Sequence, residues 1–167
     1  GVNGEVLPIV SGGVITSWYV SNAGVNYVRP KIKVNDVTIS NAVNLNSLGA
    51  VLSVTGTHGS GIQTVSSPVT SVSIGNSTIE VDVANIGNWR EGWYVYSPTA
   101  FPSHGNVAKI LSISYDTLSN KYDVILSANP EAIVATMTVQ KVTVSLVEEY
   151  GYGATVVASY KTGAVRA

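Results

Sequence analysis

The residues of this chain that could support catalysis are its carboxylates and histidines, because none of its 167 residues is cysteine. Without cysteine there are no disulfides, thiolate zinc sites, iron–sulfur clusters or cysteine nucleophiles. The two histidines, His58 and His104, each lie in a short Gly/Ser segment. Neither has a second ligand or a carboxylate at a spacing typical of a metal or catalytic site. We therefore interpret both as loop residues exposed to solvent.

The acidic residues also lack a pattern typical of catalysis. Glu148 and Glu149 are adjacent, and a strand would direct them to opposite faces. Glu80 and Asp82 would share one face, about 7 Å apart, which is typical of a strand whose charges discourage edge pairing. A polysaccharide depolymerase would need these four carboxylates to line one cleft. We expect the chain not to be an enzyme.

Calcium and nucleotide binding are the remaining site chemistries that the sequence invites. Asp116, Asn120 and Asp123 lack the Asp-x-Asp-x-Asp-Gly spacing and the bidentate Glu of an EF-hand, and a hairpin tip with Asx turns explains them as well. Residues 151–153 read Gly-Tyr-Gly, but neither a helix nor a phosphate-binding Lys follows. The sequence therefore predicts no catalytic residue, no cofactor and no metal site.

Aromatic side chains are the main resource left for binding. Five of them fall within thirteen positions: Trp89, Trp93, Tyr94, Tyr96 and Phe101. On a strand, positions 93 and 95 face one way and positions 94 and 96 the other, so we expect one face in a core and the other partly exposed. Exposed rings suit a contact between subunits or a sugar-stacking platform, and we favour the subunit contact. The predicted interface residues are Trp18, Tyr19, Trp93 and Tyr96.

The composition narrows the classes of partner. Only 11% of the residues are charged, against about 25% in a typical soluble domain, and the net charge is −1. A near-neutral chain without a basic stripe is a poor candidate for nucleic-acid binding, and no stretch approaches the roughly 20 apolar residues of a membrane span. Two explanations of the scarce charge stay open: partner subunits cover part of the surface, or Ser, Thr and Asn keep a β protein soluble.

Valine-rich runs of alternating polarity indicate an all-β fold of short strands. Leu118–Lys121 separates two such runs and predicts a hairpin. The alternating runs cover residues 15–22, 31–36, 79–83, 109–115, 122–127, 142–147 and 156–160.

Changes in composition divide the chain into two β modules. We expect residues 1–68 and 141–167 to form an outer Gly/Val-rich β module of sandwich type. Residues 69–140 hold two of the three tryptophans, and we expect them to form a small inserted β-barrel-like module. Two modules in plain succession are the alternative.

Two segments resemble repeats of known structural proteins. Residues 13–34 read GVITSWYVSNAGVNYVRPKIKV, which is similar to the Gly-rich β repeat of tailed-phage (T4-like) virion proteins of the baseplate, neck and fibre type. Asn26 stands at the second Gly of that repeat, and residues 153–165 resemble the part that follows it. Residues 77–83, 86–95, 101–107 and 122–127 are similar to a small β module of phage fibres and bacterial surface proteins, with Phe101 at the usual Ile and His104 as one extra residue before the Gly.

The resemblance implies a viral structural protein of a bacteriophage particle, such as a tail, baseplate, neck, fibre or capsid-decoration component. Its partners would be other virion proteins or copies of itself as a homo-oligomer, and its location the virion. The alternative is a receptor- or carbohydrate-binding module of a phage fibre or bacterial adhesin, with a host surface glycan as its ligand.

Overall fold

The protein is all-β, as the valine-rich alternation predicts. The computed structural model describes residues 1–39 and 43–148, so the expected C-terminal part of the outer module, residues 149–167, lies outside the described residues. None of the helices in the described ranges has the length and hydropathy to cross a membrane. The strands are β1 (Glu5–Ser11), β2 (Val14–Asn22), β3 (Pro30–Val34), β4 (Val37–Ile39), β5 (Val43–Leu45), β6 (Val51–Val54), β7 (Thr64–Pro68), β8 (Thr78–Val81), β9 (Tyr94–Tyr96), β10 (Val107–Asp116), β11 (Lys121–Leu126), β12 (Thr136–Gln140) and β13 (Val144–Glu148).

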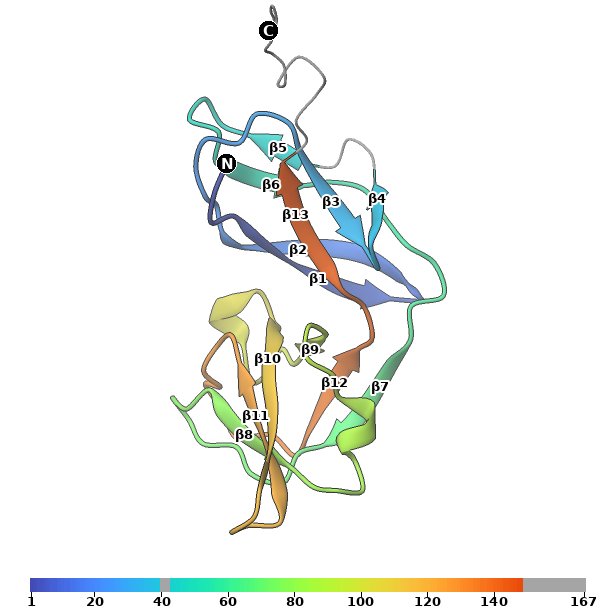
Figure 1. Cartoon of the computed structure of the whole chain (residues 1–167), viewed down its shortest axis with the longest axis vertical. Helices are drawn as coiled ribbons and strands as arrows, with labels where there is room; N and C mark the ends of the chain where they lie inside the picture. Colours follow the sequence, from blue (N-terminus) through green and yellow to red (C-terminus); the bar gives the residue numbers. More distant parts are fainter. Residues whose placement is uncertain (40–42, 149–167) are drawn as a thin grey trace, which may run out of the picture.

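Strands β7 to β12 form the lower body in Figure 1, which we call the barrel. They make one antiparallel sheet in the order β7-β12-β9-β10-β11-β8. The chain just after β7 returns to the other edge strand, because Thr70 N–H donates to Glu80 O and Glu80 N–H donates to Ser71 O. These bonds close the sheet, and closure removes the free strand edges that invite aggregation.

The barrel interior holds the apolar faces of its strands. Ile79 and Val81 on β8 and Val124 on β11 point inward and are buried, as their alternation with Glu80 and Asp123 requires. Phe101 is fully buried in the same core. The boundary expected between residues 68 and 69 falls at the end of β7, which pairs with β12, so the barrel sheet begins at Thr64.

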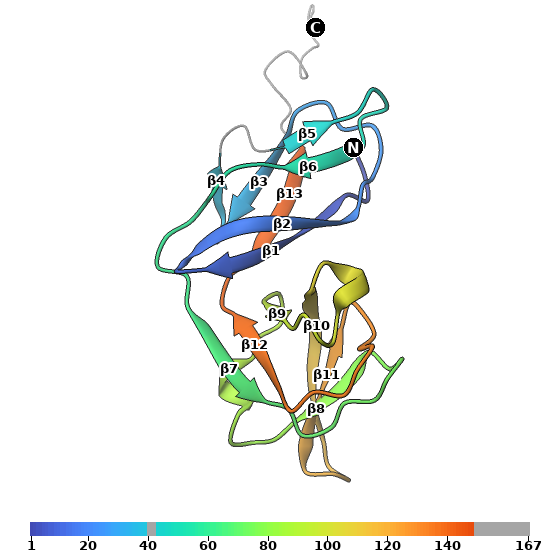
Figure 2. The same ribbon diagram turned by 180° about the vertical axis from the view of Figure 1, so that it is seen from behind.

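The remaining strands form the upper body, which we call the outer module. It contains the hairpin β1-β2, the sheet β13-β3-β4 and the hairpin β5-β6 around a second core. Figures 1 and 2 show β1 and β2 on the side of the outer module that faces the barrel. The chain enters the barrel after β6 and leaves it through β12 into β13, so both ends of the described chain belong to the outer module.

A single side-chain amide joins the two bodies. Gln140, at the end of β12, is buried; its Oε1 accepts from Val10 N–H at 2.6 Å and its Nε2 donates to Pro8 O at 3.0 Å. These two backbone groups flank Ile9, so the amide bonds β1 as one residue of a parallel neighbouring strand would. Pro8 has no N–H of its own to leave unpaired at this edge.

A tyrosine hydroxyl makes a second link. Tyr94 on β9 is buried in the core of the outer module, and its hydroxyl donates to Val144 O at 3.1 Å. Burial, together with the nearby charge of Glu5, raises the pKa of Tyr94 above its ordinary value. The hydroxyl therefore stays protonated at neutral pH and can donate this hydrogen bond.

Replacing Gln140 by alanine is expected to destabilise the protein by about 2–4 kcal/mol, because two buried backbone groups of β1 lose their partners and a cavity remains. Gln140→Glu is expected to cost nearly as much, since a carboxylate cannot donate to Pro8 O. Urea unfolding followed by tryptophan fluorescence measures both changes. The matched control is Gln63→Ala, which removes an exposed glutamine. An equal effect of the control would contradict the role of the Gln140 amide.

Candidate functional site

The surface of the outer module carries an open, largely apolar groove. It encloses about 640 Å³ and is lined by residues of two segments, 25–28 and 47–49. Val28 and Leu48 stand at its edges with 75% and 74% of their surface exposed, and Val25 is exposed beside them. Tyr27 is buried at the centre of the first segment. Large apolar side chains gathered at a concave surface are typical of a binding site.

Backbone pairing fixes the two walls of the groove relative to each other. Asn26 N–H donates to Leu48 O, and Tyr27 N–H donates to Gly49 O at 2.9 Å. The side chain of Asn46 accepts from Leu48 N–H and Ala50 N–H, so the turn is held from inside. Only glycine fits at position 49: its φ is +73°, and a Cβ there would lie 2.6 Å from Tyr27 O. The groove is therefore preformed.

The carboxylate of Glu148 holds the outer wall in place. Its Oε1 accepts from Val28 N–H and its Oε2 from Arg29 N–H, both at 2.9 Å. The amino group of Gly1 lies 3.0 Å from the same Oε1. The Glu148 side chain is only 7% exposed. Burial alone would raise the pKa of this carboxyl, but the hydrogen bonds from Val28, the amino group and Arg29 together lower it below its ordinary value of 4.5.

The lowered pKa of Glu148 predicts how stability depends on pH. A carboxyl whose folded pKa is depressed contributes stability that is present above the unfolded value of 4.5 and is lost as the pH falls through the folded pKa. We expect Glu148→Gln to reduce the free energy of unfolding by about 1 kcal/mol at pH 7. The difference from the wild type should disappear in acid, where both side chains are neutral. Urea unfolding at several pH values measures this, with the exposed Asp36→Asn as control; a pH-independent difference would contradict it.

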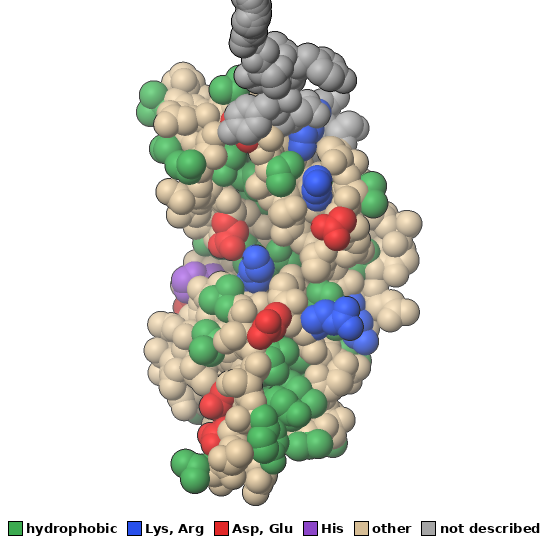
Figure 3. All heavy atoms as spheres, viewed as in Figure 1, with side chains coloured by type: hydrophobic (Ala, Val, Ile, Leu, Met, Phe, Trp, Pro, Cys, Tyr) green, Lys and Arg blue, Asp and Glu red, His purple; other side chains and the backbone are tan. Residues whose placement is uncertain are grey.

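The second apolar surface is the end of the β10–β11 hairpin, which projects at the lower end of Figure 1. Tyr115 and Tyr122 are opposite each other on the two strands, with their ring centroids 5.1 Å apart. They continue the inward face of the hairpin past the barrel core, so 47% of Tyr115 remains exposed. Leu118, at the turn, is 95% exposed. Figure 3 shows hydrophobic side chains gathered over this lower part of the barrel, beside acidic ones.

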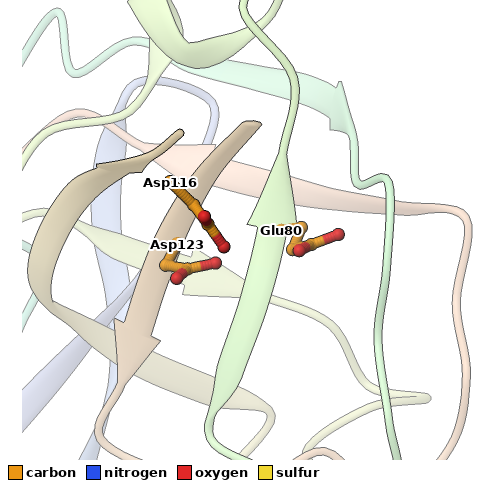
Figure 4. A group of neighbouring side chains, drawn as sticks. All are labelled: Glu80, Asp116 and Asp123. Carbon is orange, nitrogen blue, oxygen red and sulfur yellow. The ribbon is translucent and has the colours of Figure 1, made fainter. Parts of the chain in front are cut away.

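The outward face of the sheet carries three carboxylates on β8, β10 and β11. Oxygen atoms of Glu80, Asp116 and Asp123 all lie within 4.8 Å of one another. Glu80 and Asp123 are direct cross-strand partners, and Figure 4 shows Asp116 beside Asp123 on the neighbouring strand. Carboxylate oxygens are ligands that Ca²⁺ accepts, and three of them would leave most of its positions to water. The sequence analysis paired Glu80 with Asp82 instead, whereas Asp82 bonds to Asn85 beyond the end of β8.

Like charges directly opposite each other in a sheet destabilise it. Asp123→Asn is therefore expected to stabilise the protein by about 0.3–0.5 kcal/mol at neutral pH and low salt, because it removes the repulsion between positions 80 and 123. The gain should shrink as salt screens the carboxylates. Thermal unfolding at low and high ionic strength measures it. A loss of stability in the variant would show that the Asp123 carboxylate is favourably engaged.

The four predicted interface residues fall into two pairs. Trp18 and Tyr19 are on β2 and half-buried; the Trp18 ring lies 6.2 Å from that of His58, and its Nε1 has no partner in the described part of the chain. The Tyr19 ring packs against Gly105 of the barrel. This contact between the two bodies uses one of the rings that we expected at a subunit interface.

Trp93 and Tyr96 form the second pair, on the barrel. Two cations lie against the Trp93 ring, with Arg90 Cζ at 4.9 Å and Lys141 Nζ at 5.7 Å from its centroid. Tyr96 lines a more polar hollow of about 270 Å³ with Ser97, Thr99, Thr136 and Thr138. The role of both pairs in subunit contacts stays a prediction.

The histidines lie apart from each other. His58 pairs with β2 through Ile15, and its Nε2 lies 2.8 Å from Thr55 O. His104 is on the barrel, where its Nε2 is 3.8 Å from Glu131. The Ser103 N–H and hydroxyl also donate to the Glu131 carboxylate. We therefore interpret Glu131 as a residue that stabilises this loop.

The groove between residues 25–28 and 47–49 was not predicted from the sequence. Its two walls are about twenty positions apart, and no periodicity joins them. The available signal was the local one: Asn46 followed by Gly49 indicates a tight Asx turn.

Comparison of the chain with known protein families, with curated proteins and with solved structures found no match. The fold and the surfaces define the class as an all-β protein of two bodies, with exposed apolar side chains around the groove and at the end of the β10–β11 hairpin.

Proposed function

We propose that this chain is a non-enzymatic structural or assembly protein of a tailed-phage particle that acts through contacts between protein subunits. The observation that carries the proposal is the preformed groove, where Val25, Val28 and Leu48 are exposed around about 640 Å³ of open space. Exposed apolar side chains gathered in this way are a liability for a protein that stays alone in water. A partner that covers these side chains removes them from water, and their burial contributes favourably to the free energy of binding.

The scarcity of charge supports the same function. Only 19 of the 167 residues are Asp, Glu, Lys or Arg, so electrostatic repulsion between copies is weak. A chain of this composition is suited to close packing in an assembly. The likeness of residues 13–34 to the repeat of virion proteins favours a phage particle as the assembly, and hence the virion as its location.

The arrangement of reactive groups supports a protein without enzymatic activity. His58 and His104 belong to different bodies: the Nε2 of His58 lies 2.8 Å from Thr55 O, and that of His104 lies 3.8 Å from the Glu131 carboxylate. The three clustered carboxylates lie on the outward face of a sheet, where solvent reaches them. General acid–base chemistry favours groups that converge in a site that excludes water.

The test is incorporation into particles. In purified tailed-phage particles made from a genome that encodes this chain, quantitative mass spectrometry is expected to find a fixed number of copies per particle. Val28→Asp places a charge in the groove and is expected to lower that number at least about tenfold. Ile133→Asp changes a side chain that is 70% exposed elsewhere and serves as the control. Particles that lack the wild-type chain would contradict the proposed function.

A further inference from the structure

We infer that copies of this chain associate head to tail, with the β10–β11 hairpin end of one copy seated in the groove of the next. The inference rests on the proposed function, because it names the partner that covers the groove. Two unlike surfaces of one chain carry it: a convex apolar end and a concave apolar groove.

The hairpin end has the shape and rigidity of an inserted element. Leu118 is almost fully exposed at the tip, and Tyr115 continues the apolar surface behind it. Three hydrogen bonds hold the turn: Asn120 N–H donates to Asp116 O, Leu118 N–H to Asp116 Oδ1, and the Tyr115 hydroxyl to Asn120 Oδ1. A turn that is already ordered loses little conformational entropy when it binds.

The groove has matching size and chemistry. About 640 Å³ admits the side chains of a hairpin tip, and its rim offers Val25, Val28 and Leu48 to an apolar guest. Backbone pairing of its two walls keeps it open without a ligand. Both surfaces are therefore preformed, as in interfaces whose backbones move little on binding.

Charge distinguishes a second copy from other apolar partners. The hairpin carries Asp116 and Asp123, with Glu80 beside them. Arg29 is exposed and directly follows Val28, which lines the groove. Seating the tip beside Arg29 brings the acidic cluster of one copy toward a cation of the other, which lowers the repulsion that the cluster suffers alone.

The two surfaces cannot meet within one molecule. The loops that form the groove lie at the upper end of the long axis and the hairpin turn at the lower end, in both views (Figures 1 and 2). Since the contact joins different surfaces, it is heterologous: it forms a ring where the rotation closes and a filament where it does not. A hairpin tip buries less than the roughly 1,600 Å² of a standard interface, so we expect weak association that needs high protein concentration.

The test is sedimentation velocity over roughly a hundredfold range of protein concentration. The wild type is expected to form dimers and larger species, and to do so less at high salt because the charges are screened. Leu118→Ser on the tip and Val28→Ser in the groove are each expected to raise the dissociation constant at least about tenfold. Both side chains are exposed, so both variants should fold; circular dichroism confirms this. Ile133→Ser, with a similar exposed apolar residue at neither surface, should behave as wild type.

Mixing the two variants separates head-to-tail contact from every symmetric arrangement. Leu118→Ser keeps an intact groove and Val28→Ser keeps an intact tip, so the mixture is expected to form a dimer and no larger species. A wild type that stays monomeric, a mixture that stays monomeric, or an equal loss in Ile133→Ser would each overturn the inference. If the chain is nevertheless found in particles, another virion protein covers the groove and the proposed function stands; absence from particles removes the proposed function itself.

Discussion

The side-chain amide of Gln140 bonds to β1 as a peptide unit of a neighbouring strand would. How the barrel is packed against the outer module depends on this interaction. Strand β1 faces the barrel with one edge, and an unpaired N–H and C=O buried there would cost several kcal/mol. The single amide satisfies both groups, at 2.6 and 3.0 Å, because a primary amide carries the same donor and acceptor as the backbone. It does so at the last residue of β12, where the chain leaves the barrel for β13. The covalent connection between the two bodies and the hydrogen bonds of Gln140 therefore lie at the same place, the end of β12.

This arrangement sets the distance between the two candidate contact surfaces. The Tyr94 hydroxyl, bonded to Val144 O, and the Tyr19 ring, packed on Gly105, add contacts across the same junction. With the bodies joined in this way, the loops that form the groove and the turn of the β10–β11 hairpin lie at opposite ends of the long axis (Figure 1). Neither surface can therefore cover the other within one molecule. A rigid junction would keep the distance between the two surfaces the same in every copy. The copies in an assembly would then be evenly spaced.

The few charged residues are used at particular places rather than spread over the surface. Glu148 accepts two backbone N–H groups and so shapes the wall of the groove, and Glu131 secures a barrel loop through Ser103. The acidic cluster is the exception, because its three carboxylates are brought together by strand pairing although they repel one another. In a chain with only ten acidic residues, three of them therefore meet where β8, β10 and β11 adjoin.

The all-β fold, six of the thirteen described strands and the hairpin at residues 118–121 follow from sequence, because alternation of polarity and turn residues are local properties. Residues 15–22, 31–36, 109–115 and 122–127 all contain strands where the alternation predicts them. What only the tertiary structure decided is which distant segments meet. Register between β8 and β11 placed Glu80 opposite Asp123, and backbone bonds between residues 26–27 and 48–49 built the groove. These contacts depend on strand order and on the packing of two cores, which no local pattern encodes.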